Sequence, residues 1–474
     1  MGCFALERPA AKHQELSKSI AHCGRSAQWA KALQLLYAAD HCWLQPNHIN
    51  YSAAINACAH GGQWEQALAL LQSMHRRQLE RNLITYSVTI SACEKGGAWS
   101  EAMQLLAEVD RSHQNADTII LNSAISACEK GGAWTQAFIL LKELHERKLL
   151  MDVITFNATI SACEKGGQWQ LALEILQEAL QTVQASIITF NAALSACGKG
   201  QQWQISWALL QAAQESHLEA SIVSFSAAIA ACEAGGQWVG ALALLHELRN
   251  QRLQANVVTW NSAISACSIS GQWELSLHLL KLMQRDDLTA DVYSYTSAIA
   301  AFGEVDELWE SKWQLALSLF KELCYTQRPS IVSFGAVISA CERGAQWQIA
   351  LRLLQELQSN HLQCSSMVCN AALSACEKGS QWPDVLHLIS NMLGQQLQAD
   401  VITYSAAISS CQKSQKWGKT LQLFQELCRA NLHPNSITFS AAISACEKGL
   451  QFQQASRLYR EMELYAVEKP LQTG

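Results

Sequence analysis

The chain alternates two kinds of amphipathic segment along nearly its whole length. In the stretch VITFNATISACEK, the apolar side chains of Phe156, Ile160 and Cys163 recur at steps of four and three residues, which places them on one face of a helix. Gly166 and Gly167 follow at once, and glycine readily takes the backbone conformation that a helix C-terminus requires. The pattern therefore predicts a first helix that ends in a glycine turn.

A second apolar pattern begins two residues after Gly167. In WQLALEILQEAL, the side chains of Trp169, Ala172, Leu173 and Ile175 face neighbouring elements, and no glycine or proline interrupts the segment. We therefore expect a second helix, joined to the first by a tight turn. A helix–turn–helix of this size cannot bury both of its faces alone, so adjacent units must stack.

These two segments recur as one unit. The string SACEKGGAW occurs at 91–99 and again at 126–134, and close variants follow. Ten of the twelve steps between successive units measure 35 residues, one measures 34, and one measures 39 because EVDELWESKW adds four residues before Trp313. The thirteen units begin at His13, His48, Leu83, Thr118, Val153, Ile187, Ile222, Val257, Val292, Ile331, Ser366, Val401 and Ser436.

The repeat predicts the organisation of the whole chain. We expect an N-terminal tail at 1–12, an array of thirteen repeats at 13–470 and a C-terminal tail at 471–474. The expected fold class is all-α, a right-handed α-solenoid superhelix of about thirteen stacked helix-turn-helix repeats of 35 residues. Tryptophan begins the second helix in twelve of the thirteen units, and this fixed phase favours a wedge between helices over an exposed stacking platform.

The cysteines follow the same period. Of the 18 cysteines, twelve occupy one repeat position, and no CxxC pair supports a zinc site. Equivalent positions in stacked repeats hold such thiols as small buried apolar groups, which suits a reducing compartment. The twelve are Cys23, Cys58, Cys93, Cys128, Cys163, Cys197, Cys232, Cys267, Cys341, Cys376, Cys411 and Cys446.

Composition and motifs narrow the function class. Hydrophobic residues make up 49% and charged residues 16%, as in a folded soluble protein, and no apolar run reaches the length of a membrane span. The net charge of −6 argues mildly against a nucleic-acid binder, although a basic groove can coexist with an acidic surface. The motifs H-E-x-x-H, Walker A, G-x-S-x-G and G-x-G-x-x-G are absent, so we expect no enzyme, no cofactor and no metal.

Two strings connect the repeat to a known family. DVITYSAAIS at 400–409 and DVITFNATIS at 152–161 resemble the pentatricopeptide repeat consensus, and the resemblance covers all thirteen units. The tetratricopeptide repeat is a poorer match because its period is about 34 residues and it keeps a proline near its end. This chain departs from the pentatricopeptide pattern by its tryptophans and by a cysteine shifted one place.

The resemblance implies sequence-specific binding of single-stranded RNA, with one nucleotide per repeat and the repeats parallel to the strand from its 5′ end. In that family the fifth and last residues of a unit read the base edge, and the second residue packs against the base. A lysine near the end of the first helix approaches phosphate. Family members act in mitochondria or chloroplasts, in RNA processing, stability or translation, and here occupancy of the RNA would be the mode of action.

The fifth residue of each unit is small and, with one exception, polar. A merely exposed first-turn position would favour acidic residues through the helix dipole, yet none occurs. Small donors and acceptors without charge suit a surface that faces bases and phosphates. The column is Ser17, Ser52, Ser87, Asn122, Asn157, Asn191, Ser226, Asn261, Thr296, Gly335, Asn370, Ser405 and Ser440.

The last residue of each unit has two explanations that both remain open. Asn, Asp and Ser are preferred N-caps for the helix that follows, so capping alone accounts for this column. Base reading, as the resemblance implies, accounts for it equally well. The column is Asn47, Asn82, Asp117, Asp152, Ser186, Ser221, Asn256, Asp291, Ser330, Ser365, Asp400, Asn435 and Pro470.

The second residue is aliphatic in eleven units. Such side chains belong either to the core or, beside the polar fifth position, to a surface that sandwiches a base. The column is Ile49, Ile84, Ile119, Ile154, Ile188, Val223, Val258, Val332, Met367, Ile402 and Ile437.

The thirteenth residue is basic in nine units. A glutamate precedes most of these cations, and we expect it to face elsewhere because neighbours in sequence point in different directions on a helix. The cations could then track an RNA backbone, or serve only as partners of the helix dipole. The column is Arg25, Lys95, Lys130, Lys165, Lys199, Arg343, Lys378, Lys413 and Lys448.

The expected partners follow from the repeat and its columns. We expect a monomer that binds single-stranded RNA, works with protein partners of an RNA-processing complex and has no membrane contact. An organellar location follows from the resemblance, although the N-terminal segment MGCFALERPAAKHQ shows no clear transit peptide. The alternative is a scaffold of tetratricopeptide type that clasps a protein or peptide.

Overall fold

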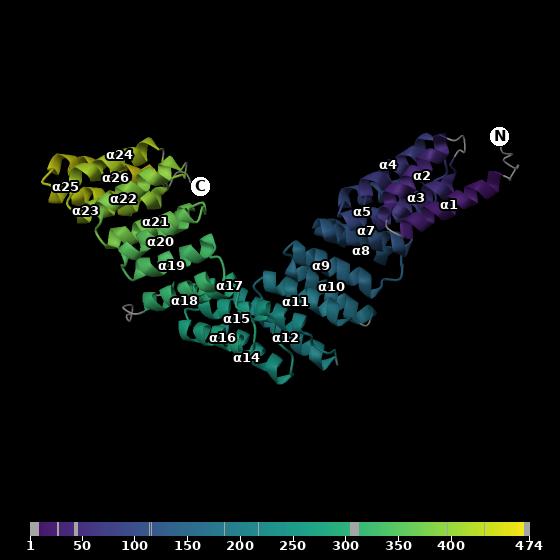
Figure 1. Ribbon diagram of the computed structural model, residues 1–474, viewed down its shortest axis with the longest axis horizontal. Helices are drawn as coiled ribbons and strands as arrows, with labels where there is room; N and C mark the ends of the chain where they lie inside the picture. The colour runs from purple at the N-terminus through teal and green to yellow at the C-terminus, as the bar shows by residue number, and fades with distance from the viewer. Residues whose placement is uncertain are drawn as a thin grey trace. The chain divides into compact units, whose positions relative to one another are not determined.

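The computed structural model consists of paired helices (Figure 1). It describes residues 9–25, 28–41, 46–112, 114, 116–183, 185–216, 218–303, 312–395, 397–430 and 432–468. The first half of the chain contains α1 (Pro9–Arg25), α2 (Trp29–His41), α3 (His48–His60), α4 (Trp64–Arg76), α5 (Leu83–Gly96), α6 (Trp99–Arg111), α7 (Thr118–Gly131), α8 (Trp134–Glu146), α9 (Val153–Lys165), α10 (Trp169–Thr182), α11 (Ile187–Lys199), α12 (Trp203–Glu215) and α13 (Ile222–Ala234).

The second half repeats the same arrangement. It contains α14 (Trp238–Asn250), α15 (Val257–Ile269), α16 (Trp273–Arg285), α17 (Val292–Ala300), the 3-10 helix η1 (Ala301–Gly303), α18 (Lys312–Thr326), α19 (Ile331–Arg343), α20 (Trp347–Ser359), α21 (Ser366–Lys378), α22 (Trp382–Gly394), α23 (Val401–Lys413), α24 (Trp417–Arg429), α25 (Ser436–Lys448) and α26 (Phe452–Glu468). From α3 onward, the first helix of every pair begins at a residue where the sequence period places the start of a unit. Along the described residues no strand occurs, and no helix has the length and apolarity needed to cross a bilayer.

The chain divides into two compact units, residues 1–235 and 236–474. In the first, α1, α3, α5, α7, α9, α11 and α13 pack one after another, and each second helix contacts the first helix of its own repeat and of the next. In the second, α15, α17, α19, α21, α23 and α25 stack in the same way. Each unit is therefore an all-α repeat solenoid, as the sequence predicts. The insertion before Trp313 and the tail at 471–474 lie outside the described residues.

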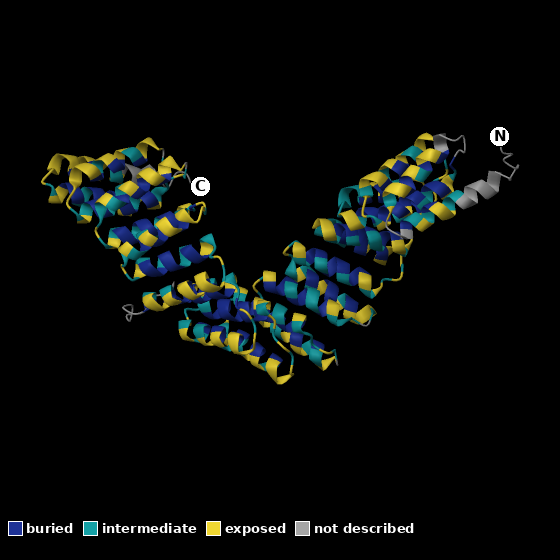
Figure 2. Ribbon diagram, viewed as in Figure 1, coloured by how far each residue is buried: buried dark blue, intermediate teal, exposed yellow. Residues whose placement is uncertain are grey.

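Buried residues recur along the helices of both units (Figure 2). The periodic cysteines belong to the first helices of the repeats. Eleven of the twelve are buried, and Cys23 is half-buried, which confirms the structural interpretation of this column. Burial raises the pKa of Cys58 to about 11 and that of Cys93 to about 12. These thiols therefore stay protonated at neutral pH, and the protonated form is a poor nucleophile.

The tryptophans contact the glycine turn of the following repeat. A Cβ atom added to Gly131 would lie 2.2 Å from Cδ1 of Trp99, and one added to Gly166 would lie 2.2 Å from Cδ1 of Trp134. The indole therefore occupies the space that any side chain on that glycine would need. The tryptophans are wedges between repeats, as their fixed phase predicts.

This contact predicts opposite effects for the same added methyl group at two glycines. We expect Gly131→Ala to lower the free energy of unfolding by about 1–3 kcal/mol, since overpacking displaces Trp99. Gly418 has no neighbouring atom within 4 Å of its added Cβ, so Gly418→Ala should be neutral or stabilise by up to about 1 kcal/mol. Urea midpoints from circular dichroism measure both variants. Equal midpoints would contradict the wedge.

Candidate nucleic-acid interface

The structure brings the fifth and last residues of a unit together although 30 residues separate them. In the fourth unit, Nδ2 of Asn122 lies 3.4 Å from both carboxylate oxygens of Asp152. Asn261 donates to Asp291 at 3.1 and 3.2 Å, and Asn370 donates to Asp400 at 3.3 and 3.2 Å. Three units thus build the same amide–carboxylate pair from equivalent positions.

A hydroxyl group from the next repeat completes each pair. The Thr155 hydroxyl lies 2.7 Å from Oδ1 of Asn122 and 2.7 Å from Oδ1 of Asp152. Ser294 and Thr403 make the equivalent contacts to the other two asparagines, at 2.6 and 2.8 Å. The asparagine oxygen is thereby occupied, and one amide hydrogen is given to the aspartate. The second amide hydrogen remains for a ligand.

The last residues also cap the following helix, so capping and pairing coexist. Oδ1 of Asp152 accepts the backbone N–H of Thr155 at 2.8 Å. The same capping contact is made by Asn47, Asn82, Asp117, Ser186, Asn256, Asp291, Ser330, Ser365, Asp400 and Asn435. At Asp400, burial alone would raise the pKa of the carboxyl, but the hydrogen bonds from Thr403 and Asn370 lower it overall. The carboxylate is therefore held in its charged form.

Two neighbouring units differ because serine ends them. Oδ1 of Asn157 and Oδ1 of Asn191 are buried and have no hydrogen-bond partner in the described part of the chain. The hydroxyl of Ser186, which ends the fifth unit, contacts the Thr189 hydroxyl at 3.1 Å. These two amides therefore lack the contacts that fix their three counterparts, and an unsatisfied buried acceptor is costly.

The units with a hydroxyl at the fifth position form a third class. Ser52 donates to the carbonyl of His48 at 2.8 Å, and Ser405 donates to that of Val401 at 2.6 Å. Thr296 does the same within α17, at 2.6 Å. Each of these hydroxyl groups donates its proton to a carbonyl of its own helix, so its oxygen can still accept a hydrogen bond from a ligand.

The second residue is exposed in the second to thirteenth units, which excludes the core alternative for the aliphatic side chains of this column. The side chains of Ile84, Ile119, Ile154, Ile188, Val223, Val258 and Ile402 are 62–66% exposed. All of them lie in the first turn of a first helix, one turn before the fifth residue. A periodic row of exposed aliphatic side chains beside polar pairs is typical of an interaction surface.

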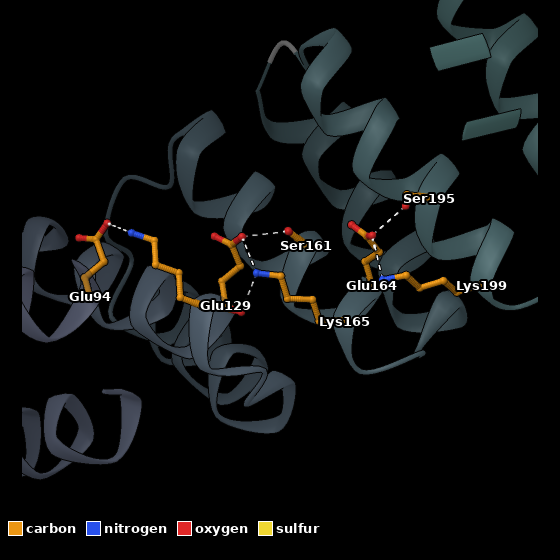
Figure 3. Close-up of polar contacts among 8 residues, drawn as sticks. Glu94, Glu129, Ser161, Glu164, Lys165, Ser195 and Lys199 are labelled. Carbon is orange, nitrogen blue, oxygen red and sulfur yellow. Dashed lines mark hydrogen bonds and ion pairs between the residues drawn. The ribbon is translucent and has the colours of Figure 1, made fainter. Parts of the chain in front are cut away.

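Five of the thirteenth-position lysines form ion pairs with glutamates. The expectation that these glutamates face away from the row of cations was therefore wrong. Lys130 pairs with Glu94 at 3.2 Å, Lys165 with Glu129 at 3.2 Å and Lys199 with Glu164 at 3.1 Å (Figure 3). The same pairing occurs within residues 236–474, where Lys378 lies 3.3 Å from Glu342 and Lys413 lies 3.1 Å from Glu377. The partner is always the glutamate of the preceding repeat, which lies directly before that repeat's own thirteenth residue.

In four of these pairs, a serine from the repeat that supplies the lysine donates a hydrogen bond to the glutamate. Ser161 donates to Glu129 at 3.0 Å and Ser195 donates to Glu164 at 2.7 Å, as Figure 3 shows. Ser374 and Ser409 make the equivalent contacts to Glu342 and Glu377. We call the five Lys–Glu pairs the ion-pair ladder. Within the described ranges, no ion pair is formed by Lys95, Arg343 or Lys448. The repeat before Lys95 has Ala59 at the position of the glutamate, and the repeat before Lys448 has Gln412 there.

Comparison with known families identifies the repeats. A model described as the PPR repeat family matches residues 46–95 and 255–304, and one for the pentatricopeptide repeat domain matches 139–200 and 387–448. A third, for the PPR repeat, matches 84–113 and 437–465, so the matched segments together cover more than half of the chain. The chain belongs to the pentatricopeptide repeat family.

A solved structure shares the fold of this chain. The pentatricopeptide repeat protein PPR10 from maize is 16% identical, with a TM-score of 0.61 over 95% of this chain and 74% of that one, which shows a shared fold. PPR10 in complex with an 18-nt psaJ RNA element is also similar, at 15% identity and a TM-score of 0.45 over 94% of this chain and 79% of that one. No curated protein sequence gives a significant match.

The surface of these repeats carries polar and apolar side chains at regular positions. Throughout the described residues, no group of three or more His, Cys, Asp or Glu side chains is arranged to hold a metal ion. What the surface offers is a series of polar pairs, each with an exposed aliphatic side chain on the same first helix. In two of the three units, that helix also carries an ion-paired lysine, Lys130 or Lys378.

The hydroxyl that bridges each pair should contribute measurably to stability. We expect Thr155→Val to lower the free energy of unfolding by about 0.5–1.5 kcal/mol, because the half-buried oxygen of Asn122 loses its hydroxyl donor. Thr135 is exposed on α8 and lies outside the pairs, so Thr135→Val serves as the control and should change little. Urea unfolding compares the two variants, and equal stabilities would argue against the bridge.

Proposed function

We propose that this chain binds single-stranded RNA sequence-specifically, with one nucleotide per repeat and the repeats parallel to the strand from its 5′ end. The observation that carries the proposal is the pairing of Asn122 with Asp152, and of its two counterparts, across 30 residues of sequence. Capping alone requires no such contact. The shared fold with PPR10, whose complex with RNA has been solved, supports the same conclusion.

The exposed second-position side chains supply the apolar part of the interface. Bases of single-stranded RNA are splayed out and stacked on protein side chains, and every base has an apolar face. Ile119 and Ile154 lie in the first turns of successive first helices, at 66% and 64% exposure. A base held between two such side chains would present its edge to the fifth and last residues.

The hydrogen-bonding state of the asparagines supports a distinction between the two pyrimidines. In an Asn–Asp unit the oxygen of Asn122 is occupied and an amide hydrogen remains, which suits the carbonyl oxygen of uracil. In an Asn–Ser unit the amide of Asn157 lacks these fixed contacts, so it can turn its oxygen toward the amino group of cytosine. The pairing rules implied by the family make the same assignment.

The full target follows from those rules. Ser with Asn selects A, Ser with Asp selects G, Asn with Asp selects U, and Asn with Ser selects C. The first eight units then specify 5′-AAGUCCAU, Thr296 with Ser330 selects a purine, the Gly335 unit selects nothing, and the next two units select U and A. The last unit ends at Pro470, outside the described residues, and stays unassigned.

We further propose that the protein acts by occupying its RNA in a mitochondrion or chloroplast. A bound array can block nucleases, hold a strand open or recruit partners of an RNA-processing complex. The family assignment is the basis for this part of the proposal. Microscopy of the tagged full chain tests the location, and a nuclear or purely cytosolic signal would contradict it.

A designed exchange of specificity tests the base-reading pairs. A 13-mer RNA with AAGUCCAU should bind more tightly than a scrambled 13-mer or the equivalent DNA. Asn122→Ser should weaken binding to this RNA and restore it when the U opposite the fourth unit becomes G. Each mismatch should change affinity about tenfold or more, corresponding to about 1–3 kcal/mol. Equal weak binding to all three ligands would instead favour a scaffold that clasps a protein or peptide.

The ion-pair ladder predicts a second effect on binding. Glu129→Gln with Glu164→Gln releases Lys165 and Lys199 from their partners. Affinity for the predicted and the scrambled RNA should both rise, and the salt dependence should steepen by up to about 0.7 log units per log unit of salt for each lysine released.

A double variant on the second helices provides the control. Glu146 and Glu174 are exposed on α8 and α10, and Glu146→Gln with Glu174→Gln removes the same total charge. Fluorescence anisotropy across a salt series compares the two proteins. If both double variants shift the salt dependence equally, the effect comes from net charge and the ladder has no part in it.

A further inference from the structure

Two cysteines lie on either side of the junction between the tenth and eleventh units, at positions where the other units have none. Cys364 is the residue before the N-cap Ser365, and Cys369 is the fourth residue of α21. Side chains at these two positions commonly pack against each other and fix the entry of the chain into a helix. Six other units have alanine at the first position, and most units have an aromatic residue at the second.

The two sulfur atoms are in close contact. Sγ of Cys364 lies 2.7 Å from Sγ of Cys369, which is only about 0.65 Å longer than a disulfide bond. Both side chains are buried, at 7% and 3% exposure. No other pair of cysteine sulfurs in the described residues shows such a contact. The fold of the helix entry, rather than a chance approach of distant segments, holds the atoms there.

The contact also makes the two thiols chemically unequal. A hydrogen bond from the Cys369 thiol lowers the pKa of Cys364 despite its burial, while the same bond and burial raise the pKa of Cys369. Cys364 is also the more exposed of the two. It is therefore the nucleophile, and Cys369 is the thiol that resolves the intermediate.

We propose that Cys364 and Cys369 form a redox-convertible site, which closes to a disulfide when a small disulfide oxidant of the glutathione type is present. The Cys364 thiolate attacks one sulfur of the oxidant and releases a thiolate, which gives a mixed disulfide. The Cys369 thiol then loses its proton, attacks Sγ of Cys364 and releases the second thiolate. The protein loses two electrons and two protons, and the oxidant becomes two thiols.

Closure would covalently fix the first turn of α21. That turn carries Met367, and Asn370 follows Cys369 directly and forms the pair with Asp400. If the proposed RNA function holds, oxidation would stiffen the base-reading edge of this repeat. The disulfide itself does not depend on that function, because it is measured on the protein alone.

The other cysteines provide internal controls. Burial raises the pKa of Cys376, in the same helix, to about 12, so this thiol should stay free. Cys324 and Cys428 are exposed and have no neighbouring thiol among the described residues. They should form mixed disulfides with glutathione, which increase the mass of their peptides. Closure instead makes the Cys364–Cys369 peptide lighter than its reduced form by two hydrogens.

The experiment is a titration of the full chain in glutathione buffers of rising oxidised fraction. Free thiols are alkylated in denaturant, and peptides are mapped by mass spectrometry without reduction. We expect the peptide with Cys364 and Cys369 to lose both alkylation sites together, and a reductant to restore them. Alkylation of both cysteines at every buffer ratio, or glutathione that stays attached to Cys364, would overturn the proposal.

Two variants keep the result interpretable. Cys364→Ala and Cys369→Phe introduce residues that other repeats carry at the same positions, so both proteins should fold, which circular dichroism checks. Each should abolish the light peptide. In Cys369→Phe, Cys364 should retain glutathione, since the resolving thiol is missing. A light peptide that persists in either variant would show that another cysteine is the partner.

Discussion

The contact between each tryptophan and the glycine turn of the next repeat sets the spacing on which the other features depend. The indole of Trp99 fills the space beside Gly131, so successive repeats can approach to only one distance. A fixed distance brings residues 30 to 36 positions apart into hydrogen-bond range again and again. The polar pairs and the ion-pair ladder are both consequences of this register.

The same register lets one side chain serve two purposes. Asp152 caps α9 through the backbone of Thr155 and also accepts from Asn122 on α7, the first helix of the unit that Asp152 ends. A cap stabilises the helix whether or not a ligand is present, by about 1 kcal/mol. The carboxylate is thus held in place by the fold itself, before the ligand of the proposed function binds. Preorganisation of this kind reduces the ordering that binding would otherwise require.

The sequence was sufficient for the fold and for the columns, because both follow from a period that repeats thirteen times. It was insufficient for contacts that depend on how one repeat is rotated against the next. Lys165 was expected to point away from glutamate, since Glu164 is its sequence neighbour, yet its partner is Glu129 of the preceding repeat. Likewise, only the three-dimensional structure separates Asn157, whose oxygen has no partner among the described residues, from Asn122, whose oxygen is occupied.

The ion-pair ladder also matters for how the negatively charged chain attracts RNA. The net charge of −6 counts both members of every Lys–Glu pair, so the ladder leaves this total unchanged and alters only the local field. Exposed ion pairs add little to stability, at most about 1 kcal/mol each, so folding alone gives weak reason to build five of them. Their stronger effect is on the field, because a lysine held by a carboxylate attracts phosphate less at a distance. Under the proposed function, non-specific attraction to RNA is thereby reduced, and a larger share of the binding energy is left to the polar pairs that we propose distinguish one base from another.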